Sequence, residues 1–374
     1  MDALTILKAA AADPYAYGAA IQTKTGKKVV GNFCTYTPEE LIVAAGGVPF
    51  RLFGTKEDIS LADKHLQSYC CSLVRGGLED ALKGNLSFLE GAVFPHTCDS
   101  IQRLSDIWRL NAGFPFHIDV VLPVKLDTKS ARTYMIDVLA GCKTDLETAL
   151  GVQITPERMH HAISIYNDIR RTLGDIYRMR SADPSILSAG DLYHVVKASM
   201  IMDRDELPAL LHALRDDLTT KAKGMSSNAG RRVIISGGIC NHPDIYAVLE
   251  ESGAQVIWDD LCTGARYFEG QIEENIDPIT AIADRYITRM VCPAKHLNVT
   301  ARGENLVSLA KTQKAAGVIF LFLKFCDPHS FDYPYLKKFL DDAGVPNILL
   351  EVEAQLPSDA QLRTRFETFV DMLN

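Results

Sequence analysis

Six of the nine cysteines in this chain stand where their thiolates could hold a metal cluster. Cys70 and Cys71 are adjacent at the start of a helix predicted over about residues 69–83, where apolar residues recur at three- and four-residue spacing. Neighbouring side chains on a helix point about 100° apart, so one tetrahedral metal ion could hardly bind both sulfurs. Two metal centres side by side could take one each. The alternative is that both are small core residues, as free cysteines often are.

The other four cysteines each follow a predicted strand, beside Asp, Thr or Gly: Cys34, Cys98, Cys262 and Cys326. Doubly wound sheets place their sites at the carboxyl ends of the strands, so two facing lobes would bring these thiolates together. Thiolates at loop tips and helix N-termini are the ligands of iron–sulfur clusters. Structural zinc sites use compact C-x₂-C pairs and thiol-redox sites use C-x-x-C, and the sequence contains neither. The pattern therefore predicts an iron–sulfur site.

Four side chains near these cysteines are candidates for catalysis. A histidine two residues before Cys98 could donate protons or cap a helix, and a glutamate near Cys34 could handle protons or serve only as a cap. Two basic residues next to predicted ligands could offset cluster charge, or could be ordinary surface residues. The candidates are His96, Glu39, Arg75 and Lys324. Cys142 and Cys240 have no such context and are interpreted as structural.

The alternation of strands and helices predicts an α/β protein with two doubly wound parallel sheets. The N-terminal α/β domain, which begins with a helix, is expected over residues 1–150, a helical linker region over 151–230, and the C-terminal α/β domain over 231–374. Residues 221–230 are polar and glycine-containing, which is typical of a hinge. The predicted strands are residues 29–33, 48–53, 91–94 and 117–122, then 233–236, 255–258, 317–323 and 348–353. A helix is predicted over residues 335–342, between the last two strands.

Composition excludes several classes of function. The chain has 374 residues, 47% of them hydrophobic, and a net charge of −8, which argues against nucleic acid as the main partner. No apolar run approaches the roughly 18 to 20 residues of a membrane helix, and the N-terminus lacks the layout of a signal peptide. Nine cysteines without such a signal favour a reducing compartment. We expect a cytoplasmic protein that binds neither nucleic acid nor membranes.

Several motifs together resemble the 2-hydroxyacyl-CoA dehydratase and benzoyl-CoA reductase family. They are Phe325-Cys326-Asp327-Pro328, Phe331-Asp332-Tyr333-Pro334, Cys98-Asp99, Cys71-Ser72, Pro38-Glu39-Glu40-Leu41, the stretch 44–49, and Gly344-Val345-Pro346. The likeness covers nearly the whole chain. It implies two flavodoxin-like lobes with an oxygen-sensitive iron–sulfur cluster between them. It also implies dimers and a separate ATP-hydrolysing activator, with its own [4Fe–4S] cluster, that delivers low-potential electrons; ATP is then bound by the activator and not by this chain.

In dehydratase subunits of this family, three cysteines hold one [4Fe–4S] cluster with an open iron, and the matching positions here are Cys71, Cys98 and Cys326. Three further thiols appear where such subunits generally lack them: Cys34, Cys70 and Cys262. Two sets of three cysteine ligands suit two cubanes joined through a sulfide. The chain therefore looks most like the double-cubane ([8Fe-9S]) branch, whose members are homodimeric reductases. Cys292 is an alternative to Cys34 as the sixth cysteine ligand.

This resemblance implies an ATP- and activator-dependent iron–sulfur oxidoreductase that reduces small molecules. The alternative is a [4Fe–4S] subunit of a heterodimeric 2-hydroxyacyl-CoA dehydratase or benzoyl-CoA reductase. A third reading, from a different class, is a metal-free binding protein whose cysteines serve packing.

Overall fold

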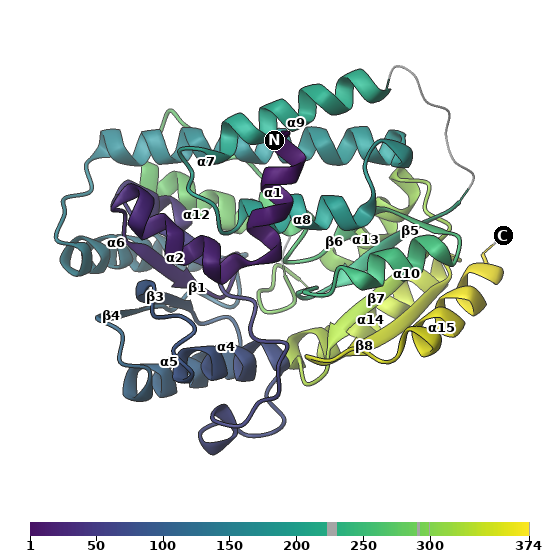
Figure 1. Ribbon diagram of the computed structural model, residues 1–374, viewed down its shortest axis with the longest axis horizontal. Coiled ribbons are helices and arrows are strands. Elements are labelled where there is room, and N and C mark those ends of the chain that lie inside the picture. Colours follow the sequence, from purple (N-terminus) through teal and green to yellow (C-terminus); the bar gives the residue numbers. More distant parts are fainter. Residues whose placement is uncertain (223–229, 290–291, 299, 374) are drawn as a thin grey trace.

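The computed structural model describes residues 1–222, 230–289, 292–298 and 300–373. Within these ranges the chain forms two four-stranded sheets, in which all paired strands run parallel. In Figure 1 the first sheet lies among the purple and blue elements and the second among the green and yellow ones. Each sheet with its flanking helices makes one lobe, called the N-lobe and the C-lobe. The predicted α/β class is confirmed.

The N-lobe sheet has the order β2-β1-β3-β4. Its strands are β1 (Val29–Asn32), β2 (Val48–Arg51), β3 (Leu89–Pro95) and β4 (Phe116–Val120), and its connecting helices include α3 (Glu39–Ala44), α4 (Ser72–Leu82) and α5 (Asp99–Asn111). The strand order reverses between β1 and β3, so their carboxyl ends flank the crevice that such sheets use for binding. Cys34 follows β1 and Cys98 follows β3, as the sequence predicted.

The C-lobe sheet repeats this order as β6-β5-β7-β8. Its strands are β5 (Arg231–Gly237), β6 (Ala254–Asp260), β7 (Gly317–Leu323) and β8 (Asn347–Val352), and its helices are α10 (Asp244–Glu251), α11 (Ala265–Phe268), α13 (Ala301–Thr312), α14 (Asp327–Asp342) and α15 (Asp359–Asp371). The apolar run of β7 is buried at every position, which suits a central strand covered on both faces. Cys326 follows β7 and Cys262 follows β6.

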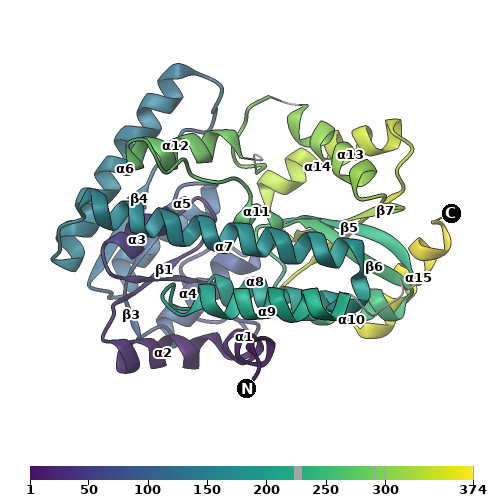
Figure 2. The ribbon, with the colours of Figure 1, turned by 90° about the horizontal axis from the view of Figure 1, so that it is seen from above.

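Long helices connect the two lobes. They are α6 (Lys129–Leu150), α7 (Pro156–Ala182), α8 (Ala189–Ser199) and α9 (Leu207–Ala222), with α1 (Ala3–Ala12) and α2 (Pro14–Thr25) beside them. Figure 2 shows α7 and α9 running side by side across both sheets, and α12 (Pro278–Thr288) lying against α6. A helix from the second half of the chain therefore packs on the N-lobe side. Most of the predicted hinge lies outside the described residues, and the domain boundaries stay a prediction.

A buried polar network fastens the lobes to each other. Glu39 on α3 accepts hydrogen bonds from Tyr166 Oη at 2.7 Å, Arg204 Nη2 at 3.0 Å and Tyr267 Oη at 3.1 Å. Tyr267 belongs to α11 of the C-lobe, and Arg204 is 1% exposed. All three hydrogen bonds go to Oε2 of Glu39, and they offset part of the cost of burying this charge. This network holds the carboxyl ends of the two sheets in a fixed relation.

Two helix predictions need correction. The N-terminal helix is two helices, because Asp13 caps the second one and Pro14 begins it. Helix α14 begins at Asp327, whereas the sequence predicted a start at residue 335. Pro334 lies inside α14, and proline is disfavoured in helix interiors, which conceals the first two turns in the sequence. No described helix has the length and apolarity that a membrane crossing requires.

Candidate metal centre

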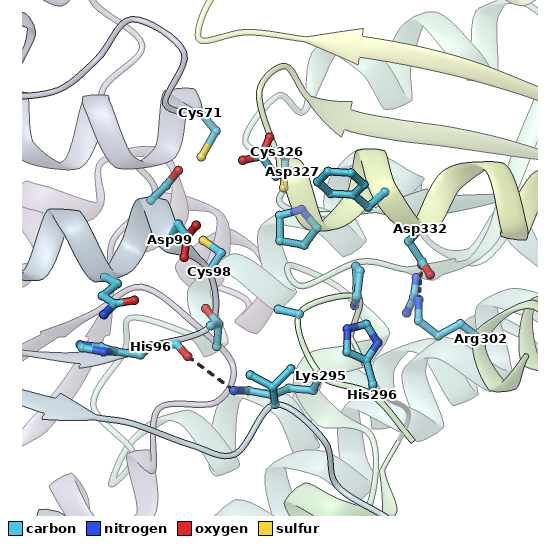
Figure 3. Close-up of a pocket in the computed structure, with 18 of the residues that line it drawn as sticks. Cys71, His96, Cys98, Asp99, Lys295, His296, Arg302, Cys326, Asp327 and Asp332 are labelled. Atoms are coloured by element: carbon cyan, nitrogen blue, oxygen red, sulfur yellow. Dashed lines mark hydrogen bonds and ion pairs between the residues drawn. The ribbon is translucent and has the colours of Figure 1, made fainter. Parts of the chain in front are cut away.

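Cys71, Cys98 and Cys326, hereafter the outer cysteines, line one cavity of about 530 Å³. Figure 3 shows their sulfur atoms directed toward a common space. Cys71 and Cys98 come from the N-lobe and Cys326 from the C-lobe, so the cavity lies between the lobes. The predicted convergence of thiols from two facing sheets is present at these three positions.

Each outer cysteine is the N-cap of a helix: Cys71 of α4, Cys98 of α5 and Cys326 of α14. The unpaired N–H groups and the positive dipole end of a helix favour a thiolate there. Burial works in the opposite direction, because it disfavours charge. Burial prevails without a bound cation: it raises the pKa of the Cys98 thiol to about 12 and that of Cys326 well above its ordinary value. A bound metal would reverse this balance.

A second group, Cys34, Cys262 and Cys292, lies beside the first and is hereafter called the inner cysteines. Cys34 and Cys292 share one buried apolar cluster, and neither they nor Cys262 line the cavity. Burial and the charges of Cys262 and Cys34 raise the pKa of Cys292 to about 11. Cys34 also acts electrostatically on Cys98, and Cys262 acts on Cys326. The two groups are therefore neighbours.

The remaining three cysteines differ in position. Cys70 is buried, and its charge acts on its neighbour Cys71. Cys142 is packed in α6 within an apolar cluster, where burial raises its pKa to about 12. Cys240 is buried on the C-lobe side, and its Sγ lies 3.6 Å from the carbonyl oxygen of His242. Neither Cys142 nor Cys240 lines the cavity.

Buried cations surround the inner cysteines. Lys295 is 1% exposed and donates through Nζ to the carbonyl oxygens of Leu122 at 3.0 Å and His96 at 3.5 Å. Arg289 lies with its guanidinium 4.1 Å from the ring centre of Tyr36 and donates to a backbone carbonyl. In the described part of the chain, neither cation has a carboxylate at ion-pair distance.

Several ionisable groups lie near these cations. When ionised, the thiols of Cys292 and Cys34 would act on Lys295, and on Arg289 the groups of Tyr36 and Tyr286 would act more strongly than these two thiols. Arg266 donates to Cys262 Sγ at 3.4 Å and pairs with Asp260 at 2.8 Å. A buried cation without an anion is costly, so this region favours anionic sulfur. No sequence motif marks these three cations, because their meeting depends on long-range packing.

Of the predicted catalytic residues, His96 lines the cavity. Its ring N–H donates from Nε2 to Asp119 Oδ1 at 2.7 Å, and Asp119 also accepts from Ser105. Although burial opposes it, hydrogen bonds from His117, Ser105 and His96 hold the pKa of Asp119 well below its ordinary value. The carboxylate therefore orients His96 at the cavity wall, where an imidazole can donate or accept a proton.

The structure does not bring the other three candidates into the cavity. Glu39 is occupied in the network between the lobes. Arg75 pairs with Asp63 at 2.7 Å and Lys324 with Glu353 at 2.8 Å. Arg75 and Lys324 line a separate polar groove. Within the described residues, no three His, Cys, Asp or Glu side chains meet closely enough to hold a single metal ion.

Comparison with known proteins identifies the family. Residues 34–373 match the model of the 2-hydroxyglutaryl-CoA dehydratase D-component. The chain is 30% identical to the (R)-phenyllactyl-CoA dehydratase beta subunit of Clostridium sporogenes, over 94% of this chain and 93% of that protein. It is 27% identical to the beta subunit of (R)-2-hydroxyglutaryl-CoA dehydratase from Acidaminococcus fermentans, over 93% of both chains. It is 26% identical to one of the subunits of benzoyl-CoA reductase from Thauera aromatica, over 93% of this chain and 91% of that one. The chain therefore belongs to the 2-hydroxyglutaryl-CoA dehydratase D-component family.

Proposed function

We propose that this chain is an iron–sulfur reductase that holds a double-cubane cluster between its lobes. The observation that carries the proposal is the gathering of six cysteines from both lobes into two adjoining groups of three. The outer cysteines would hold one cubane and the inner cysteines the other. A cubane is several atoms across, so its thiolates need not meet at one point as the ligands of a single ion must.

The inner group includes Cys292, whereas the sequence favoured Cys70. Cys292 interacts electrostatically with both Cys34 and Cys262, and it shares a buried cluster with Cys34. Cys70 lies before helix α4 and does not line the cavity, and its charge acts on Cys71 of the outer group. We therefore assign the sixth thiolate to Cys292 and leave Cys70 as a packing residue.

The surroundings fit an anionic cluster. Lys295, Arg289 and Arg266 supply positive charge at the inner cysteines. Buried donor groups lie on either side of Cys34 in the sequence: among the described residues, the Asn32 amide and the Tyr36 hydroxyl have no hydrogen-bond partner. Sulfides and thiolates accept hydrogen bonds from such groups, which tunes the reduction potential of a cluster.

When bound, the cluster would supply low-potential electrons to a small molecule in the cavity. The protein would exclude bulk water from the inner cysteines and hold His96 at the wall as a proton donor. We further propose a homodimer in the cytoplasm and an ATP-hydrolysing activator protein as electron donor. Both follow from the likeness to the double-cubane branch of the family.

Iron analysis tests the proposal. Anaerobically purified chain should contain about eight irons, as thiolate ligation of two linked cubanes implies. Cys292→Ser should lose about half of this iron or all of it, whereas Cys70→Ser and the matched control Cys142→Ser should retain it. Equal iron content in Cys292→Ser and Cys142→Ser would overturn the ligand assignment.

A second candidate is a single [4Fe–4S] subunit of an acyl-CoA dehydratase or benzoyl-CoA reductase. The observation that favours it is that only the outer three cysteines line the cavity, together with the names of the relatives. About four irons per chain, unchanged in Cys34→Ser and Cys262→Ser, would support this candidate and contradict the double cubane.

A further inference from the structure

A buried histidine close to Cys326 has no hydrogen-bond partner for its ring. His329 is the third residue of α14 and is only 5% exposed. Its ring Nδ1 is fully enclosed and unpartnered, and within the described residues no hydrogen bond reaches either ring nitrogen. Buried polar groups are nearly always hydrogen-bonded, because losing water without a replacement is costly. This imidazole therefore requires a partner other than the side chains around it.

His329 adjoins one outer and one inner cysteine. Its backbone N–H forms a hydrogen bond that favours the thiolate of Cys326 and lowers the pKa of that thiol, although burial prevails. The ring lies against Gly238, where an added Cβ would be 3.4 Å from the ring Nε2. The carbonyl oxygen of Gly238 accepts a hydrogen bond from the backbone N–H of Cys262 at 2.8 Å. His329 does not line the cavity, so it approaches these two cysteines from within the C-lobe.

The groups packed around the ring cannot satisfy it. The ring of Phe322 is apolar and lies 5.0 Å away between centres. Arg266 and Arg302 are close enough that their charges, together with burial, hold the pKa of His329 well below its ordinary value. Both guanidinium groups are donors only, and both already pair with Asp260. Since an imidazole carries at least one N–H in either protonation state, the missing partner is an acceptor.

From these observations we infer that His329 is a cofactor-binding residue, which donates a ring N–H to a sulfur atom of the iron–sulfur cluster. Cluster sulfides and thiolates accept such hydrogen bonds. A donor beside the sulfur stabilises the more negative, reduced cluster more than the oxidised one, so His329 would raise the reduction potential. The inference rests on the proposed function, because it needs a cluster held beside Cys326 and Cys262.

A leucine substitution separates this role from simple packing. His329→Leu keeps a similar volume and removes both ring nitrogens. In the cluster-free chain, the urea midpoint of unfolding should equal or exceed that of the wild type, because an unpartnered buried group is lost. In the loaded chain at a fixed low potential, the ratio of reduced to oxidised cluster, measured by EPR, should fall at least about threefold, as the loss of one hydrogen bond implies. A histidine that serves packing alone would lower the midpoint and leave the ratio unchanged.

Two polar variants and a matched control complete the design. His329→Asn and His329→Gln each offer an amide N–H near one of the ring nitrogens, and at least one of them should restore the wild-type ratio. His242→Leu is the control, because His242 is also buried but its Nε2 lies 3.1 Å from the carbonyl oxygen of Glu353. This control should lower the urea midpoint and leave the ratio of reduced to oxidised cluster unaltered.

Pulsed EPR of the reduced protein, with its histidines labelled with heavy nitrogen, gives the direct readout. We expect a weak nitrogen coupling that disappears in His329→Leu. No such coupling, a strong coupling typical of nitrogen bound to iron, or equal ratios in wild type and His329→Leu would each overturn the inference.

Iron content separates this failure from failure of the proposed function. About eight irons per chain with no effect of His329→Leu would retain the double cubane and refute the role of His329. About four irons with the expected effect would retain the role of His329 and contradict the double cubane. A chain that binds no iron would refute both.

Discussion

Arg266 donates a hydrogen bond from Nη2 to Cys262 Sγ at 3.4 Å, while its Nη1 pairs with Asp260 at 2.8 Å. Arg266 is 3% exposed, and its Nη2 also donates to the carbonyl oxygen of Gly237. One buried guanidinium thus contacts the carboxyl ends of β5 and β6 and the thiol of one inner cysteine. The charge of Cys292 acts on the same guanidinium, after that of Asp260 and Cys262. Substitutions of the buried cations and of the Glu39 network should have distinct effects.

Lys295→Met should change the stability of the cluster and leave that of the chain nearly unaltered. In cluster-free protein the substitution removes a buried ammonium group, which stabilises the fold, and two hydrogen bonds, which destabilises it. The two effects oppose each other, so the free energy of unfolding should shift by no more than about 1 kcal/mol. In loaded protein the cluster loses a buried counter-charge, and chelators should remove iron about tenfold faster or more. Absorbance at the cluster band during chelation measures this rate. Lys64→Met, an exposed lysine, is the control; equal release from both variants would contradict the role of Lys295.

Glu39→Gln should destabilise the fold by about 3 to 5 kcal/mol, because it leaves the buried Arg204 without its carboxylate. Urea unfolding measures the loss. Glu90→Gln is a suitable control, since Glu90 pairs with Lys28 on the surface and such pairs contribute about 1 kcal/mol or less. A Glu39→Gln variant of normal stability that has lost activity would instead indicate that Glu39 handles protons.

His242 predicts a loss of stability in mild acid. Burial, together with the charge of Lys56, lowers the pKa of His242 to about 4 from its ordinary 6.5. Below about pH 6.5 the unfolded chain binds a proton that the folded chain does not, so the contribution of neutral His242 is complete above this pH. It is lost toward pH 4, at up to about 1.4 kcal/mol per pH unit. His242→Asn should flatten this part of the stability profile, measured by chemical denaturation, whereas His160→Asn on an exposed helix face should not. A wild-type profile that is level between these pH values would contradict the buried neutral histidine.

Local sequence patterns predicted the sheets well. The strand around β7 was predicted with its observed limits, and the other seven strands lie within three residues of theirs, because buried apolar runs of this length are distinctive. Cys34, Cys98, Cys262 and Cys326 were correctly placed after strands for the same reason. The start of α14 was wrong, since Pro334 inside the helix hides a start directly after Cys326.

The position of Cys292 and the partners of Arg75 and Lys324 depend on long-range packing, which local sequence patterns do not reveal. Cys292 reaches Cys34 because α12 crosses to the N-lobe and packs on α6. The backbone after Cys292 then pairs with the N-lobe, where Leu126 N donates to the carbonyl oxygen of His296 at 2.8 Å. Arg75 and Lys324 are near outer cysteines in the sequence but pair with carboxylates in another groove. Nearness to a ligand in the sequence therefore did not bring these two basic side chains to the cavity wall.

The most direct test of the central claim is anomalous diffraction at the iron edge from crystals grown without oxygen. The double-cubane proposal predicts iron peaks within bonding distance of the sulfurs of Cys71, Cys98 and Cys326, with a second group of peaks at Cys34, Cys262 and Cys292. Well-ordered crystals of freshly reduced, brown protein that show no iron between the lobes would contradict it.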